Sequence, residues 1–159
     1  MAHSYLSTTA TGSTTIFTVD FPFLQRSHVK VYSDGVEIDA STLTWLSDGQ
    51  VQLPGASGSV YTGKVILRQR VTPDDGPYSV FQAGAFDHGA LNKVLDQMVY
   101  LAVERADATK VPYKVAHLPS ASASGAGALR YCTNETGGAV MVFSDGTNWR
   151  RVTDRAVAS

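Results

Sequence analysis

The stretch VKVYSDGVEIDASTLTWLSDGQVQL, residues 29–53, contains two Ser-Asp-Gly turns set among alternating apolar residues. Ser33-Asp34-Gly35 follows the apolar run that begins at Val29, and Ser47-Asp48-Gly49 precedes Val51 and Leu53. Asp-Gly pairs are typical of tight hairpin turns, because both residues tolerate the positive φ angles that such turns need. The stretch therefore predicts β-hairpins.

Further short strands are expected on both sides of this stretch. They have β-branched or aromatic residues and are separated by Gly, Asp and Ser turns, and they cover residues 15–19, 28–32, 36–38, 43–46, 51–53 and 64–70. The last of them alternates as a half-buried strand does, with Val65, Leu67, Gln69 and Val71 on one face and Ile66, Arg68 and Arg70 on the other. Strands of this length and spacing predict a β-sandwich or a compact barrel.

The sequence period then changes from that of strands to that of one long helix. Asp87 can cap its first turn, and the helical pattern continues to about Ala108. Four apolar residues of this helix follow a/d spacing, namely Leu91, Val94, Met98 and Leu101. Two uses of this stripe remain open: it packs on its own β-domain, or it joins copies of itself in a short coiled coil, here a homotrimer.

Residues 118–128 are small, polar and rich in Gly, so we interpret 109–127 as a linker or an extended arm. The segment that follows predicts a three-stranded β-meander with a third turn at Ser144-Asp145-Gly146. A meander of about 30 residues is too small to be stable alone, which suggests that it needs a partner. The expected parts are a β-rich domain (1–86), a helix (87–108), a linker (109–127) and a C-terminal meander (128–159), mainly β with one long helix in an α+β fold.

Composition excludes several classes of partner. The net charge is −1, and the basic residues form no cluster larger than Arg150-Arg151, so we expect no nucleic acid partner. The single cysteine, Cys132, can form no disulfide within the chain. No apolar run is long enough to cross a bilayer, and Met1-Ala-His-Ser lacks a signal-peptide core, so we expect no membrane insertion and a soluble protein made in a cytoplasm.

The sequence contains no recognisable catalytic or metal-binding set. The four histidines, His3, His28, His88 and His117, lack the spacing of metal ligands, so we expect no metal and no cofactor. The adjacent pair Asp74-Asp75 lies in a Pro/Gly turn, which favours turn formation over acid and base chemistry. No base is marked near the possible nucleophiles Ser79, Cys132 and Ser144. We therefore expect a protein that is not an enzyme.

Several motifs, and their order along the chain, resemble the N-terminal tail-attachment domain of tail fibre proteins from short-tailed, podovirus-type bacteriophages. The resemblance covers about residues 1–108. It rests on Phe21-Pro-Phe-Leu24, the two Ser-Asp-Gly turns, Leu67-Arg-Gln-Arg-Val-Thr-Pro73, Val80-Phe81-Gln82-Ala-Gly84 and the helix from Leu91-Asn92 to Asp107. Residues 128–159, with Gly137-Gly-Ala-Val140 and the run from Phe143 to Asp154, are similar to a small C-terminal module of phage and prophage tail proteins.

The resemblance implies a structural virion protein of the phage tail, made in the host bacterial cytoplasm. In that family the domain anchors a homotrimeric fibre between the adaptor and nozzle proteins of the tail, and a shaft and a receptor-binding tip follow. Here only a linker and a meander follow the helix, so we expect a short fibre or a fibre connector that holds a distal fibre or spike protein. The alternatives are a tip protein that binds or degrades the host surface and a head decoration fibre.

An outer partner interface is expected on the C-terminal module. Its candidate residues are aromatic or polar, namely Tyr131, Phe143, Asn148, Trp149 and Arg150. In the alternative tip protein, Tyr131, Asn148, Trp149 and Arg150 would contact a host surface glycan. Trp45 and Trp149 favour an anchoring role in a core or interface over a sugar platform.

Overall fold

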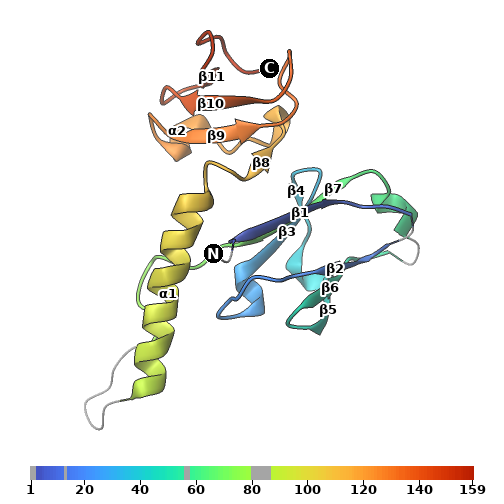
Figure 1. Cartoon of the computed structure of the whole chain (residues 1–159), viewed down its shortest axis with the longest axis vertical. Coiled ribbons are helices and arrows are strands. Elements are labelled where there is room, and N and C mark those ends of the chain that lie inside the picture. The colour runs from blue at the N-terminus through green and yellow to red at the C-terminus, as the bar shows by residue number, and fades with distance from the viewer. Residues whose placement is uncertain (1–2, 13, 56–57, 80–86) are drawn as a thin grey trace. The chain divides into compact units, whose positions relative to one another are not determined.

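The computed structural model describes residues 3–12, 14–55, 58–79 and 87–159. The chain divides into two compact units, one of residues 1–33 and 37–106 and one of residues 34–36 and 107–159. Figure 1 labels their elements. The prediction of a mainly β protein with one long helix is confirmed. The expected Val80–Gly84 motif lies outside the described residues.

The first unit contains two antiparallel β-sheets. One has the order β1-β7-β3-β4 and the other β2-β6-β5. The strands are β1 (Tyr5–Thr9), β2 (Ile16–Thr18), β3 (Val29–Ser33), β4 (Val36–Glu37), β5 (Thr44–Ser47), β6 (Gln50–Gln52) and β7 (Val65–Arg70), and the short 3-10 helices are η1 (Arg26–His28), η2 (Ala40–Thr42) and η3 (Gly58–Tyr61). The predicted strands are therefore found, whereas β1 was not expected.

The hairpin prediction is confirmed at both Ser-Asp-Gly turns. Asp34 and Gly35 connect β3 to β4 with φ angles of 51° and 87°. The second turn connects β5 to β6, which pair antiparallel, with Trp45 opposite Val51. The positive φ at both central residues of the first turn suits the right-handed twist of neighbouring strands, whereas neither Asp48 nor Gly49 of the second turn has a positive φ.

The two sheets of the first unit share one hydrophobic core. Val29, Val31 and Ile66 contribute from the larger sheet, and Phe17 and Val51 from the smaller one. Strand β7 is central in its sheet, with β1 on one side and β3 on the other. Its residues Ile66, Arg68 and Arg70 share one face and are all buried, so two arginines lie on the same strand face as a core isoleucine.

Helix α1 (His88–Asp107) confirms the predicted helix within one residue at each end. Its first turn is capped as expected, because the Asp87 carboxylate accepts hydrogen bonds from the backbone N–H groups of Gly89 (2.8 Å) and Ala90 (3.2 Å).

The second unit contains a four-stranded sheet of order β11-β10-β9-β8. Strands β9 (Leu129–Cys132), β10 (Val140–Ser144) and β11 (Trp149–Arg151) form the predicted antiparallel meander, and β8 (Pro112–Tyr113) adds to it parallel to β9. The third Ser-Asp-Gly turn connects β10 to β11, with Gly146 at a φ of 94°.

The interpretation of residues 109–127 as a linker is corrected by the structure. This range contains β8, the 3-10 helix η4 (Val115–His117) and the short helix α2 (Ala121–Ser124). Val115, Leu118 and Ala121 pack with Cys132, Val142 and Trp149 in one core. The Ser/Ala/Gly composition misled the interpretation, because small residues also allow close packing over a small sheet. The segment supplies the apolar cover that a bare meander lacks.

Candidate functional site

The face of α1 that contacts the β-rich part of its own unit carries polar side chains that bind this part. Gln97 is buried, and its side-chain oxygen accepts from the backbone N–H of Tyr78 at 2.8 Å. Its side-chain NH₂ donates to the carbonyls of Pro73 (2.7 Å) and Gly76 (2.9 Å). This amide therefore uses both its acceptor and its donors to fix the segment after β7.

Glu104, two turns further along the same helix face, forms a buried ion pair with β7. Its carboxylate lies 2.7 Å from Nε of Arg70, whose side chain is only 1% exposed. It also accepts from the backbone N–H (3.0 Å) and the hydroxyl (2.6 Å) of Thr72.

The remaining contacts of Arg70 complete this junction. Its guanidinium donates to the carbonyls of Pro22 (2.7 Å) and Tyr100 (3.2 Å) and lies 4.1 Å from the centroid of the Tyr100 ring. A buried charge pair is tolerated only when its remaining hydrogen-bonding groups are satisfied, and this one meets that condition.

Three large apolar residues of α1 lie outside this contact face and are exposed. At about 100° per residue, Leu95 and Val99 lie on the side opposite to Gln97 and Glu104, and Met98 lies on the flank between the two sides. Their exposed fractions are 48%, 62% and 58%. Helices of globular proteins normally bury the apolar face and expose the polar one. Helix α1 instead buries Gln97 and leaves these three apolar side chains exposed, so the described residues leave an apolar surface on this helix uncovered.

The four residues predicted for a trimer interface are divided by the structure. Met98 lies within the exposed apolar surface, whereas Leu91, Val94 and Leu101 are half-buried. The predicted trimer interface and the exposed apolar surface therefore share Met98. Their other residues lie on different sides of the helix.

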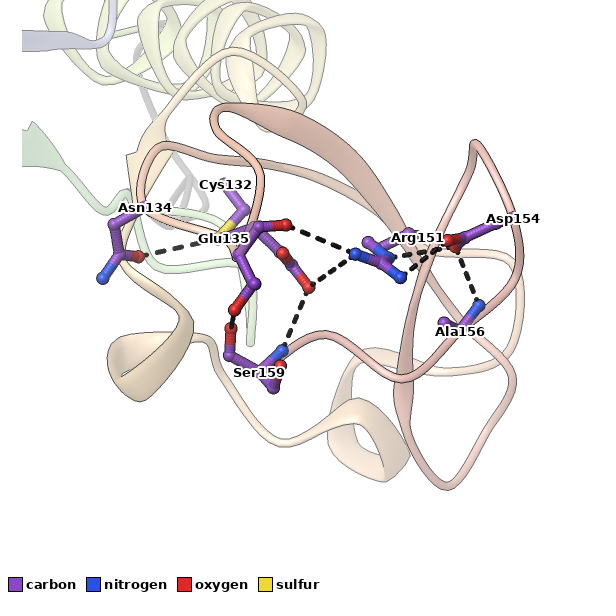
Figure 2. Close-up of polar contacts among 8 residues, drawn as sticks. Cys132, Asn134, Glu135, Arg151, Asp154, Ala156 and Ser159 are labelled. Carbon is purple, nitrogen blue, oxygen red and sulfur yellow. Dashed lines mark hydrogen bonds and ion pairs between the residues drawn. The ribbon is translucent and has the colours of Figure 1, made fainter.

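In the second unit, a polar network holds the C-terminal end against the sheet, as Figure 2 shows. Arg151 makes paired contacts with Asp154 at 2.9 and 2.6 Å and lies 3.7 Å from the buried carboxylate of Glu135. Glu135 also accepts from the backbone N–H of Ser159 at 3.2 Å, and the Thr136 hydroxyl donates to the Ser159 carbonyl. These contacts have a structural role, because they hold the last residues of the chain in place.

The five residues predicted for an outer interface have different environments. Trp149 is 8% exposed, lies in the core, and donates from its indole N–H to the Pro119 carbonyl at 2.6 Å. Arg150 pairs with Asp145, whose turn also contains Asn148. Tyr131 and Phe143 are half-buried and lie on the other face of the sheet from Trp149. The structure thus brings Tyr131 and Phe143 to one face and uses Trp149 for folding.

The residues considered for chemistry have structural surroundings. Cys132 is buried, and burial raises the pKa of its thiol, which disfavours the reactive thiolate. The Ser144 hydroxyl donates to the Ala121 carbonyl at 2.8 Å, and Asp74 and Asp75 are exposed. Within the described residues no group of His, Cys, Asp or Glu could hold a metal ion. None of the described helices is long and apolar enough to span a membrane.

Sequence reasoning missed the burial of Arg68 and Arg70, which are each 1% exposed. Alternation correctly placed them on one face of β7, but it could not say that this face is the core face. The available signal was Ile66, because a strand that places a large apolar residue on a face usually buries that face.

A comparison with protein families gives one match that spans most of the chain. The family described as the phage T7 tail fibre protein, N-terminal domain, matches residues 1–120. A comparison with curated proteins gives no match. The match confirms the resemblance drawn from the Phe-Pro-Phe-Leu motif, the Ser-Asp-Gly turns and the helix. The chain therefore belongs to the family of the phage T7 tail fibre protein, N-terminal domain, and is a structural component of a bacteriophage tail fibre.

Proposed function

We propose that this protein forms a homotrimer that anchors to the adaptor and nozzle proteins of the phage tail and holds a distal fibre or spike protein. The observation that carries the proposal is the arrangement of α1. Gln97 and Glu104 bind Arg70, Thr72 and the segment after β7, and the exposed side chains of Leu95, Met98 and Val99 are left for another chain. Membership of a tail fibre family supports the tail as the place of attachment.

Three copies of α1 provide a suitable cover for the exposed apolar side chains. Leu91, Leu95, Met98 and Ala102 follow spacings of four, three and four residues, which is the heptad pattern of a coiled coil. The seam predicted from the sequence used Leu91, Val94, Met98 and Leu101. The exposure of Leu95 favours the first register, because an uncovered leucine gains more from association than the half-buried Val94 does.

The same proposal assigns a role to each part of the chain. Residues 1–86 form the tail-attachment domain and residues 87–108 the trimerising helix. The module within residues 128–159, with the packed segment 109–127, holds the distal protein. Tyr131 and Phe143, on the sheet face away from Trp149, are the aromatic contacts of that outer interface, with Arg150 opposite Phe143 and Asn148 in the turn before β11. The burial of Trp149 argues against the alternative of a glycan-binding tip, because a sugar platform needs an exposed ring.

The attachment proposal is tested by binding to purified tails that lack fibres. The samples are the full chain, residues 1–110 and residues 107–159, with folding of each fragment checked by circular dichroism. The full chain and residues 1–110 should co-sediment with the tails, and residues 107–159 should stay in solution. Binding by residues 107–159 alone would reverse the assignment.

A further inference from the structure

A pocket of about 250 Å³ opens between strands β1 and β2 of the first unit. Leu6, Ile16 and Phe17 give it apolar walls, and Arg68 lines it from β7. The remaining lining is rich in hydroxyl groups, with Thr8, Thr9, Thr11, Thr14 and Thr18. Such a mixture of apolar walls, hydroxyl donors and one cation is typical of a site that binds a specific polar group.

Arg68 is a buried cation that forms no ion pair with a carboxylate of the described residues. Its guanidinium donates to the Thr8 hydroxyl and to the Ile66 carbonyl (3.0 Å) and lies 5.6 Å from the centroid of the Phe17 ring. Its Nε has no hydrogen-bond partner. Burial lowers the pKa of Arg68 to about 10, and Asp20 offsets this only in part.

The neighbouring Arg70 shows what Arg68 lacks. Both side chains point to the same face of β7 and both are 1% exposed, but only Arg70 has a counter-ion, Glu104. Buried charges in proteins are normally paired, because an isolated ion loses its hydration without compensation. An anion in the pocket would give Arg68 the partner that it lacks within the described chain.

The position of the pocket indicates how an anion is presented. Strand β1 lies at the edge of the sheet β1-β7-β3-β4, and strand β2 lies at the edge of the sheet β2-β6-β5. Edge strands can accept an added extended segment through backbone hydrogen bonds, and alternate side chains of that segment then point to one side. A carboxylate on such a segment would point toward Arg68.

We propose that this pocket binds an aspartate or glutamate side chain carried on an extended segment of a partner protein, with Arg68 as its counter-ion. The threonine hydroxyls supply further donors to the carboxylate. The proposal rests on the proposed function only for the source of the segment, which we assign to a tail protein.

The pocket is tested on the full chain by NMR of the Arg68 Nε–H group. The probes are the capped peptide Thr-Val-Glu-Val-Thr, the matched Thr-Val-Gln-Val-Thr, sodium acetate and inorganic phosphate. The Glu peptide and acetate should both shift the Arg68 resonance, and the Glu peptide should bind at least tenfold more tightly than the Gln peptide. Equal affinity for the two peptides, or no shift at millimolar Glu peptide, would overturn the proposal. Tighter binding of phosphate than of the Glu peptide would assign the pocket to a free anion instead.

Variants separate this proposal from tail attachment itself. Arg68→Met should abolish the Glu peptide response and weaken tail binding at least tenfold, whereas the exposed Arg26→Met should change neither. If Arg68→Met fails to fold, the titration of the unaltered chain decides. If the unaltered chain does not bind tails but the Glu peptide shifts Arg68, tail attachment fails and the pocket stands. If it binds tails and Arg68→Met binds them equally well, the pocket has no part in attachment and the proposal fails.

Discussion

At the scale of single residues, Glu104 joins α1 to the β-rich part of the first unit. Its carboxylate serves Arg70 and both polar groups of Thr72 at once, and little of it is exposed to water. Losing one member of a buried pair leaves the other charge uncompensated, which is costlier than losing a surface pair.

Glu104→Gln should therefore lower the free energy of unfolding by about 3 kcal/mol. The matched control is Asp48→Asn, which breaks the exposed pair with Arg26 and should cost about 0.5 kcal/mol. Urea unfolding followed by circular dichroism measures both. Similar losses for the two variants would show that the Arg70 pair contributes no more than a surface contact.

Asp145 gives the second unit a defined response to acid. Hydrogen bonds from the backbone N–H of Asn148, from the Arg150 side chain and from the backbone N–H of Thr147 lower the pKa of Asp145 to about 2. Between this value and the ordinary 3.8 the unfolded chain binds more protons than the folded one. The contribution of Asp145 to stability is therefore present above its ordinary pKa of 3.8 and is lost as the pH falls toward 2.

Asp145→Asn should remove that part of the acid dependence. The measurement is the urea midpoint of the second unit from pH 5 to pH 2, followed by Trp149 fluorescence in a Trp45→Phe background. The parent should lose more stability over this range than the variant does. Asp75→Asn, which changes an exposed turn residue of the first unit, serves as the control and should behave as the parent. Parallel curves for parent and Asp145→Asn would contradict the assignment.

At the scale of elements, α1 differs from an ordinary surface helix because polar side chains attach it to its own unit. The two possible registers of a trimer can be separated by aspartate substitutions. Leu95→Asp and Met98→Asp place a charge in the exposed apolar surface of α1. Val94→Asp tests the register that uses Val94. The first two should reduce the mass in solution from three times 17.0 kDa toward 17.0 kDa at micromolar concentration.

Multi-angle light scattering gives these masses directly. Asn92→Asp, on the same helix and exposed, is the control for added charge and should leave the mass unchanged. A trimer lost only with Val94→Asp would favour the register predicted from the sequence. A monomeric mass for the unaltered chain would contradict the proposed homotrimer.

The elements show how far the sequence alone predicts this fold. The Asp-Gly turns and the α1 period are local signals, so the hairpins and the helix could be placed from a few residues. Strand β1 could not, because Tyr5–Thr9 pairs with a strand some 60 residues away and carries no turn of its own. The segment 109–127 was missed for a related reason, since its apolar residues are few and spaced irregularly.

The candidate site was less predictable than the fold. Apolar spacing identified the stripe of α1, but the choice of face depended on Gln97 and Glu104, which bind groups distant in sequence. The pairing of Arg70 and the isolation of Arg68 depend on tertiary contacts in the same way. Trp149 was correctly considered an anchor, but the chain uses it in its own core.

At the scale of the whole molecule, the assignment as a tail fibre component predicts no degradation of host polysaccharide. The candidate nucleophiles Cys132 and Ser144 are buried in structural contacts. Purified protein incubated with host capsule should release no reducing ends above a buffer control. Release that persists in a Met98→Asp variant and disappears on heating would assign an activity to this chain and contradict the expectation.

The most direct test of the account is electron cryomicroscopy of the intact virion that contains this protein. The account predicts density for the first unit against the tail, in three copies around a bundle of α1 helices, with the second unit further from the tail wall. Density for this chain on the head, or attachment to the tail through the second unit, would contradict it.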